Sequence, residues 1–76
     1  MALACVMINC KPGTAREVAK IVAGMSGVKR AFETLGAYDV VAEYEFSSLD
    51  KLGISVYEIA RISGVSSTET LIETLM

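Results

Sequence analysis

Four consecutive residues near the middle of the chain, Gly36, Ala37, Tyr38 and Asp39, carry groups that could bind a small polar ligand. Gly36 has no side chain, so a ligand could approach its backbone closely, and free N–H groups there could hold an anion. The carboxylate of Asp39 could hold a cation through a charge-assisted hydrogen bond. The ring of Tyr38 could pack on the ligand or on a neighbouring subunit. These residues are our candidate site.

The same residues also suit an ordinary turn. Residues 28–35 and 39–46 have the composition of strands, so the connection between them is short enough for a tight hairpin. Gly36 can adopt the positive φ that such a turn requires, and Asp39 can accept hydrogen bonds from neighbouring amides. A turn is the simpler interpretation of these residues taken alone. The surrounding elements decide whether a binding site is expected as well.

The hairpin is flanked by predicted strands and helices. Residues 2–8 are apolar at odd and even positions alike, which predicts a strand covered on both faces. Residues 15–25 and 49–62 carry apolar residues at helical spacing, and residues 66–75 form a last strand. Gly53, inside the second helix, costs about 1 kcal/mol relative to Ala. We expect it to mark close packing of that helix on the sheet.

Each predicted helix begins at a capping signal and ends at a glycine. Thr14 and Glu17 form a capping box before the first helix, and residues 47–50 form a less complete signal before the second. Gly27 and Gly64 each follow a serine at the helix end, where glycine suits the left-handed conformation.

The two halves of the chain repeat the same pattern. The sequence Met-Ser-Gly-Val at residues 25–28 returns as Ile-Ser-Gly-Val at residues 62–65, and Glu-Thr-Leu at 33–35 returns at 69–71. Two strand-helix-strand units joined by the hairpin give β-α-β-β-α-β, an α+β ferredoxin-like sandwich. We therefore expect a four-stranded antiparallel sheet with two helices on one face, forming one domain over residues 1–76. The bare face is expected to pair with another copy, as in a dimeric α+β barrel.

Composition favours self-association and argues against other partners. Of the 76 residues, 53% are hydrophobic, which is more than one small core can bury. No apolar run approaches the roughly 20 residues of a membrane span, and the opening residues lack the features of a signal peptide. The net charge is −2 and the seven basic residues are scattered, so we expect no direct binding to nucleic acid. The chain contains no His, the commonest general base and metal ligand, and we expect no metal and no cofactor.

The two cysteines cannot form a disulfide with each other within one chain. Cys5 and Cys10 are separated by about 16 Å of extended strand, whereas a disulfide needs Cα atoms within about 7 Å. Two buried thiols in a reducing cytoplasm are the preferred interpretation. A disulfide between subunits through Cys10 is the alternative.

Several segments of the chain, in this order and spacing, resemble the effector-binding domain of the Lrp/AsnC transcription regulators, also called the regulation-of-amino-acid-metabolism domain. They are residues 8–13 (Ile-Asn-Cys-Lys-Pro-Gly), 26–28 (Ser-Gly-Val), 36–42 (Gly-Ala-Tyr-Asp-Val-Val-Ala), 63–65 (Ser-Gly-Val) and 67–70 (Ser-Thr-Glu-Thr). The resemblance covers nearly the whole chain. It implies the fold derived above, dimers paired through their sheets and rings of four dimers. Because the chain starts at the first strand, it resembles the stand-alone members, without a DNA-binding domain.

The resemblance also implies a ligand and its site. Family members bind amino acids between neighbouring dimers at the hairpin that corresponds to residues 36–39. A free amino acid carries an ammonium group, which Asp39 could meet, and a carboxylate, which the amides near Gly36 could meet. Thr68 and Thr70 match the Ser/Thr-rich stretch of the family and could add hydroxyl groups across the interface. Equally, they could be ordinary strand residues.

We therefore expect an amino-acid sensor that is not an enzyme and has no catalytic residue, acting in part by co-assembly with a full-length regulator. A small cofactor-free enzyme of the dimeric barrel type is the first alternative. Its site would usually need a His, Trp or Arg cluster, and this chain has no His, no Trp and no such cluster. A purely structural oligomerisation module is the second alternative. The identity of the amino acid does not follow from the sequence.

Overall fold

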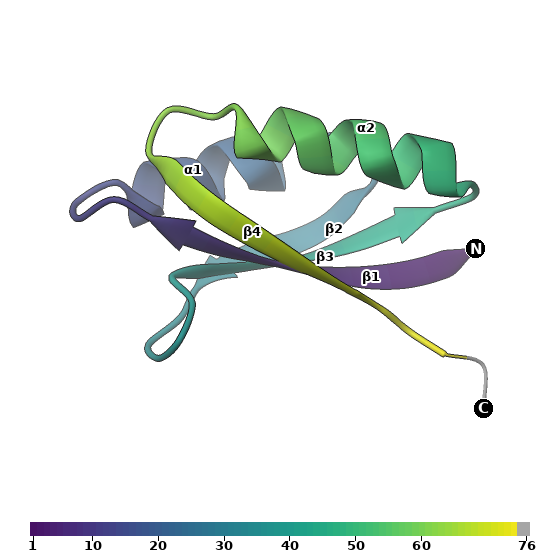
Figure 1. The fold of residues 1–76 in the computed structure, drawn as a ribbon, viewed down its shortest axis with the longest axis horizontal. Coiled ribbons are helices and arrows are strands. Elements are labelled where there is room, and N and C mark those ends of the chain that lie inside the picture. The colour runs from purple at the N-terminus through teal and green to yellow at the C-terminus, as the bar shows by residue number, and fades with distance from the viewer. Residues whose placement is uncertain (75–76) are drawn as a thin grey trace.

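The computed structural model of the protein describes residues 1–74, which fold as one sheet with two helices. The elements are β1 (Ala2–Cys10), α1 (Ala15–Ala23), β2 (Val28–Glu33), β3 (Val40–Phe46), α2 (Leu49–Ala60) and β4 (Val65–Ile72). The strands pair antiparallel in the order β2-β3-β1-β4. Both helices cover one face of the sheet, and the loop between β2 and β3 hangs from the other side (Figure 1). The predicted ferredoxin-like sandwich is confirmed.

The core lies between the sheet and the helices. Alternate residues of the two central strands are at most 1% exposed and face the helices, as expected for strands with one covered face. These residues are Ala4, Val6 and Ile8 of β1 and Val40 and Ala42 of β3. All of these except Ala4 pack against Val18 and Val22 of α1 and Ile59 of α2. Ala4 belongs to a second cluster with Tyr44, Phe46 and Leu52. No helix in residues 1–74 is both long enough and apolar enough to cross a membrane.

The opposite face of the sheet, here called the open face, is partly apolar and partly charged. On this face, Met7 of β1 lies opposite Val41 of β3, and Cys5 of β1 lies opposite Glu43 of β3. All four of these residues are half-buried. Arg30 of β2 lies 3.1 Å from the carboxylate of Glu43, an ion pair across two neighbouring strands. The open face therefore presents strips of apolar surface beside paired charges, and the pairing of copies through it stays a prediction.

Several strand boundaries differ from the sequence-based expectation. β2 ends at Glu33 and β3 begins at Val40, so the connection is the longer loop 34–39, and the predicted tight hairpin is wrong. The loop is closed by the Thr34 amide, which donates to the Asp39 carbonyl at 2.9 Å. β4 runs from Val65 to Ile72, and the part of the predicted strand at residue 75 lies outside the described residues.

The turns after the two helices confirm the internal repeat, although α1 ends at Ala23 and α2 at Ala60, before the predicted residues 25 and 62. Gly27 and Gly64 have φ angles of +89° and +101°. Each is followed by a valine whose amide donates to a carbonyl three residues back, Val28 to Met25 at 3.2 Å and Val65 to Ile62 at 3.1 Å. A Cβ on Gly27 would lie 2.5 Å from Cε1 of Tyr44. Both the backbone conformation and the available space therefore require glycine at residue 27.

The two helices differ in their side-chain caps, and the difference is the opposite of the one predicted from the sequence. Ser48 caps α2, its Oγ accepting from the Lys51 amide at 3.2 Å. Thr14 makes no such bond to α1, and its hydroxyl donates instead to the Lys11 carbonyl at 2.7 Å. The predicted capping box at Thr14 is therefore wrong, because the preceding turn takes the hydroxyl. The expectation for Gly53 is also wrong, since this residue is exposed and a Cβ there would have no atom within 4 Å.

The two kinds of glycine should respond in opposite ways to alanine. We expect Gly27→Ala to lower the free energy of unfolding by about 1–3 kcal/mol, because alanine is strained at this positive φ and its Cβ meets Tyr44. Gly53→Ala should raise it by up to about 1 kcal/mol, because alanine has the better helix propensity and meets nothing. Urea denaturation of both variants measures this. A stabilised Gly27→Ala variant would contradict the assignment.

Candidate functional site

The loop 34–39 is tied to the end of β1 through Asp39. The Asp39 amide donates to the Ile8 carbonyl at 2.9 Å, and the Asp39 carboxylate accepts from the Cys10 amide at 2.7 Å through Oδ2. The backbone pairing between β1 and β3 ends at this point, and the Asp39 side chain takes the place of a backbone acceptor. No hydrogen bond within residues 1–74 uses the second carboxylate oxygen, Oδ1. Asp39 is therefore held in place with one oxygen available to a ligand.

Tyr38 reaches across β1 to the edge strand of the sheet. Its hydroxyl donates to Oε1 of Glu69 on β4. Glu69 pairs with Met7 of β1, so it belongs to the open face. The contact folds the loop over one end of the open face and places a second carboxylate at the site.

The two carboxylates change the pKa of their neighbours. The hydrogen bond to Glu69 raises the pKa of Tyr38, because the carboxylate stabilises the neutral phenol that donates to it. Burial raises the pKa of the Cys10 thiol, and the negative charge of Asp39 raises it further, while a hydrogen bond with Thr14 opposes the rise. The Tyr38 shift thus comes mainly from its hydrogen bond to Glu69, whereas the Cys10 shift comes mainly from burial, with the charge of Asp39 adding to it.

The predicted site residues are only partly brought together. The structure places residues 36–39 in one loop, with Gly36 at φ +144°. Thr68 and Thr70 do not lie with them, because they pair with Ile8 and Val6, whose side chains are buried beneath the helices. Residues directly opposite in an antiparallel pair share a face. The two threonines therefore lie on the helix-covered side of the sheet, and their role in ligand binding stays a prediction.

Sequence reasoning missed Glu69, the residue of β4 that contacts the loop. The signal was present, since side chains alternate along a strand and Glu69 lies between the two threonines. If Thr68 and Thr70 lie on one face of the sheet, Glu69 must lie on the other face. The pairing of β4 with β1 was needed to show which face holds the loop.

The arrangement suits a ligand with a positive group next to a negative one. Asp39 and Glu69 can attract a cation, and within residues 1–74 no hydrogen bond uses the amide N–H of Gly36 or Ala37. The loop also carries the fully exposed side chain of Leu35. The described residues hold no cluster of potential metal ligands. One chain supplies this site as an open surface, which a second chain could close.

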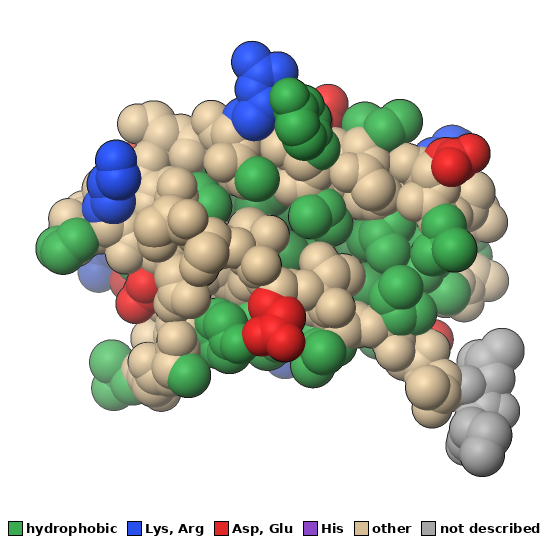
Figure 2. Space-filling model, viewed as in Figure 1, with side chains coloured by type: hydrophobic (Ala, Val, Ile, Leu, Met, Phe, Trp, Pro, Cys, Tyr) green, Lys and Arg blue, Asp and Glu red, His purple; other side chains and the backbone are tan. Residues whose placement is uncertain are grey.

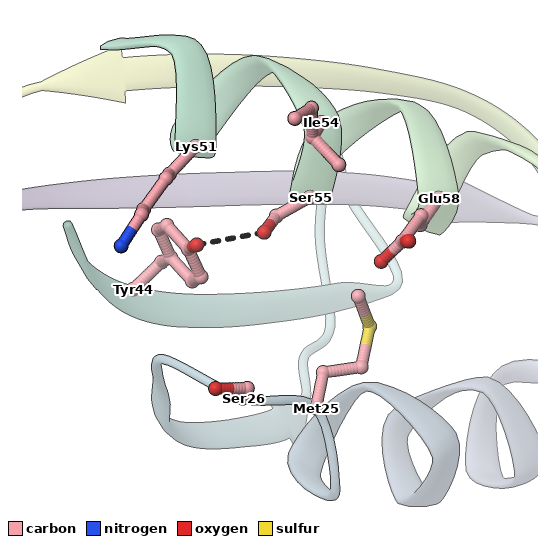
Figure 3. Close-up of a pocket in the computed structure, with 7 residues that line it drawn as sticks. All are labelled: Met25, Ser26, Tyr44, Lys51, Ile54, Ser55 and Glu58. Atoms are coloured by element: carbon pink, nitrogen blue, oxygen red, sulfur yellow. Dashed lines mark hydrogen bonds between the residues drawn. The ribbon is translucent and has the colours of Figure 1, made fainter. Parts of the chain in front are cut away.

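A separate cleft of about 440 Å³ lies on the helix side of the sheet, between the end of α1 and the side of α2. Tyr44 forms its floor, and its hydroxyl lies 2.7 Å from the Ser55 hydroxyl (Figure 3). Lys51 and Glu58 extend into it from two turns of α2 (Figure 3). None of the predicted site residues lines this cleft.

Comparison with known proteins assigns the family. The sequence profile described as the Lrp/AsnC ligand binding domain matches residues 3–74. The chain belongs to this family. The predicted resemblance is thereby confirmed, and residues 3–74 form an Lrp/AsnC-type ligand-binding domain. No curated protein sequence matches it.

Crystal structures of three proteins illustrate the similarity of this Lrp/AsnC-type domain to known folds. A Thermus thermophilus protein is 26% identical with a TM-score of 0.94, over 100% of this chain and 96% of the other. A hypothetical protein of Pyrococcus horikoshii is 28% identical with a TM-score of 0.89, over 100% and 93%. AsnC of Escherichia coli is 25% identical with a TM-score of 0.84, over 99% of this chain but 51% of AsnC.

The contact between Tyr38 and Glu69 should be visible in a titration of this Lrp/AsnC-type domain. We expect Glu69→Gln to lower the pKa of Tyr38, because a neutral amide stabilises the neutral phenol less than a carboxylate does. Because the folded-state pKa is raised, the contact stabilises the fold below the unfolded pKa of about 10 and ceases to do so as the pH rises through the folded value. Ultraviolet difference spectra measure the titration, with Tyr38→Phe identifying its signal. An unchanged titration would disprove the contact.

The contact between Asp39 and Cys10 gives a second test. Asp39→Asn keeps an oxygen that can accept from the Cys10 amide but removes the charge. We expect the pKa of Cys10 to fall and its thiolate to appear at lower pH, although burial still raises the value. The pH dependence of alkylation, measured in a Cys5→Ser background, reports this. Alkylation with the same midpoint in both proteins would show that Asp39 does not act on Cys10.

Proposed function

We propose that this domain binds a free amino acid at the loop 34–39 and that binding shifts its assembly. The observation that carries the proposal is the fixed carboxylate of Asp39, whose Oδ1 makes no hydrogen bond within residues 1–74; the same holds for the backbone amides of Gly36 and Ala37 in the same loop. Membership of a ligand-binding domain family supports it. The ammonium group would lie at Asp39 and the carboxylate at the amides, each in a charge-assisted hydrogen bond.

Assembly completes the site in this proposal. The open face carries an apolar hollow of about 190 Å³ whose lining includes Leu3, Cys5 and Leu71. Pairing of two open faces would bury this surface, and the loop, with the exposed side chain of Leu35, would then meet a neighbouring copy. A ligand bound between copies stabilises the assembly that completes its site. Rings of four dimers and co-assembly with a full-length regulator are extensions of the same proposal.

Two more distant structures guide the choice of ligands to test. A transcriptional regulator of Neisseria meningitidis, 18% identical with a TM-score of 0.84, was crystallised as a complex with L-methionine. The siroheme decarboxylase NirDL, 19% identical with a TM-score of 0.84, was crystallised with an iron-uroporphyrin III analogue. At these identities the likeness shows the fold alone. We propose binding without turnover for this chain, because its loop fits a small zwitterion.

A thermal scan against the standard amino acids tests the proposal, with sizing chromatography beside it. We expect one or a few amino acids, L-methionine among those tested first, to raise the melting temperature by a few degrees. A ligand present at 100 times its dissociation constant stabilises by about 2.7 kcal/mol. Asp39→Asn should abolish the shift, because it removes the charge that meets the ammonium group while an acceptor for Cys10 remains.

The matched control is Glu17→Gln, which removes a negative charge from the exposed side of α1. This variant should keep the full shift. Stabilisation that survives in Asp39→Asn would place the ligand elsewhere. No stabilisation by any amino acid would overturn the proposed function.

A further inference from the structure

The flank of α2 that faces the end of α1 is polar, which is unusual for the side of a helix next to another helix above a sheet. Lys51, Ser55 and Glu58 follow one another at intervals of four and three residues, so they lie on the same side of α2. All three line the cleft between the helices. The outer surface of α2 instead carries hydrophobic side chains beside a basic one (Figure 2), and Tyr57 on that surface is 64% exposed. The helix thus presents polar side chains to the cleft and apolar ones outward.

Packing between the helices does not fill this cleft. Its volume of about 440 Å³ lies within the range of small-molecule sites, about 300–1,000 Å³. Met25 contributes an apolar wall from the turn after α1 (Figure 3). The ring of Tyr44, which forms the floor, packs directly on the backbone of Gly27 in the same turn. The cleft therefore has a fixed floor and an opening between two helices.

The two charged groups of the cleft lack a partner in the part of the chain that the structure describes. Within residues 1–74, no ion pair and no hydrogen bond uses the ammonium group of Lys51 or the carboxylate of Glu58. The two side chains lie on either side of the hydrogen bond between Tyr44 and Ser55 (Figure 3). Two turns of helix, about 10 Å along the axis, separate them. The cleft thus has a positive end and a negative end.

A pair of hydroxyl groups lies between these two ends. The hydroxyls of Tyr44 and Ser55 are 2.7 Å apart, so one donates to the other. Each hydroxyl carries one proton, and their mutual hydrogen bond uses only one of the two. Among residues 1–74, no other hydrogen bond uses the second proton, which can be donated to a carbonyl oxygen. A ligand with an acceptor near its middle therefore fits the cleft.

We propose that this cleft binds a short peptide of about three residues with free amino and carboxyl ends. Three extended residues span about 10 Å, which matches the separation of the two charges. The peptide carboxylate pairs with Lys51 and its ammonium group with Glu58, while a central carbonyl accepts from the hydroxyl pair. Met25 and Ile54 favour small apolar side chains. The site is separate from the loop 34–39 and does not depend on amino-acid binding there.

Titration with trialanine tests the proposal, followed through the amide signals of the isotope-labelled protein in NMR spectra. We expect the signals of Ser26, Tyr44 and Ser55 to shift along one saturating curve at millimolar concentrations, because exposed charges contribute little affinity. Alanine should cause no such shifts, because its two charges are adjacent and cannot reach both ends of the cleft. Trialanine with both ends blocked should cause none either. No saturable shift with trialanine, or equal shifts with the blocked peptide, would overturn the proposal.

Removal of each charge identifies the two ends of the site. We expect Glu58→Gln to weaken trialanine binding about threefold to fivefold. It should have no further effect on N-acetylated trialanine, in which the ion pair is already absent. Lys51→Gln and the C-terminal amide of trialanine should behave in the same way. Independent, additive losses in these cycles would show that the charges do not meet and would overturn the proposal.

Matched control variants remove the same charges from the exposed side of α1. They are Glu17→Gln and Lys20→Gln, and both should leave the affinity for trialanine unchanged. Asp39→Asn should also bind trialanine as the wild type does, because none of residues 34–39 lines the cleft. Loss of peptide binding in Asp39→Asn would contradict a separate site. A failed thermal scan with intact peptide binding would overturn only the amino-acid proposal.

Discussion

A sheet with helices on one face only has a second face that water or another chain must cover. In this domain the central strand β1 lies between β3 and β4 and is apolar on both sides. Its residues toward the helices are buried, whereas those on the open face, such as Cys5 and Met7, are only half-buried. The loop 34–39 lies at the end of that face. The position of the candidate site is therefore a consequence of how the sheet is covered.

The candidate site shows how one side chain can combine a structural and a chemical role. Asp39 completes the ladder between β1 and β3 by accepting from the Cys10 amide, and the same bond holds its carboxylate in a fixed place. Fixing a charge before the ligand arrives lowers the entropy cost of binding. Glu69 adds negative charge from another strand through Tyr38. These contacts place two carboxylates at one end of the sheet.

The two helices differ although the repeat gives them matching ends. The buried residues of α1 are Val18, Ala19 and Val22, and its outer side is mainly polar. The outer side of α2 instead carries large apolar side chains around Gly53. A sheet needs only one apolar stripe from each helix. The repeat therefore fixes the turns after the helices but not the composition of their outer sides.

The sequence by itself determined the order of the elements, the face that β3 buries and the glycines in the turns that follow both helices. Those features depend on local spacing and on backbone conformations that only glycine adopts readily, as at Gly27 and Gly64. It did not determine the length of the loop, the capping of α1 or the position of Glu69 beside Tyr38. The hydrogen bonds of Asp39 decide the length of the loop, and the hydrogen bond of the Thr14 hydroxyl decides the capping of α1. The pairing of β4 with β1 decides the position of Glu69. Such contacts join residues far apart in the chain, and only the folded structure brings them together.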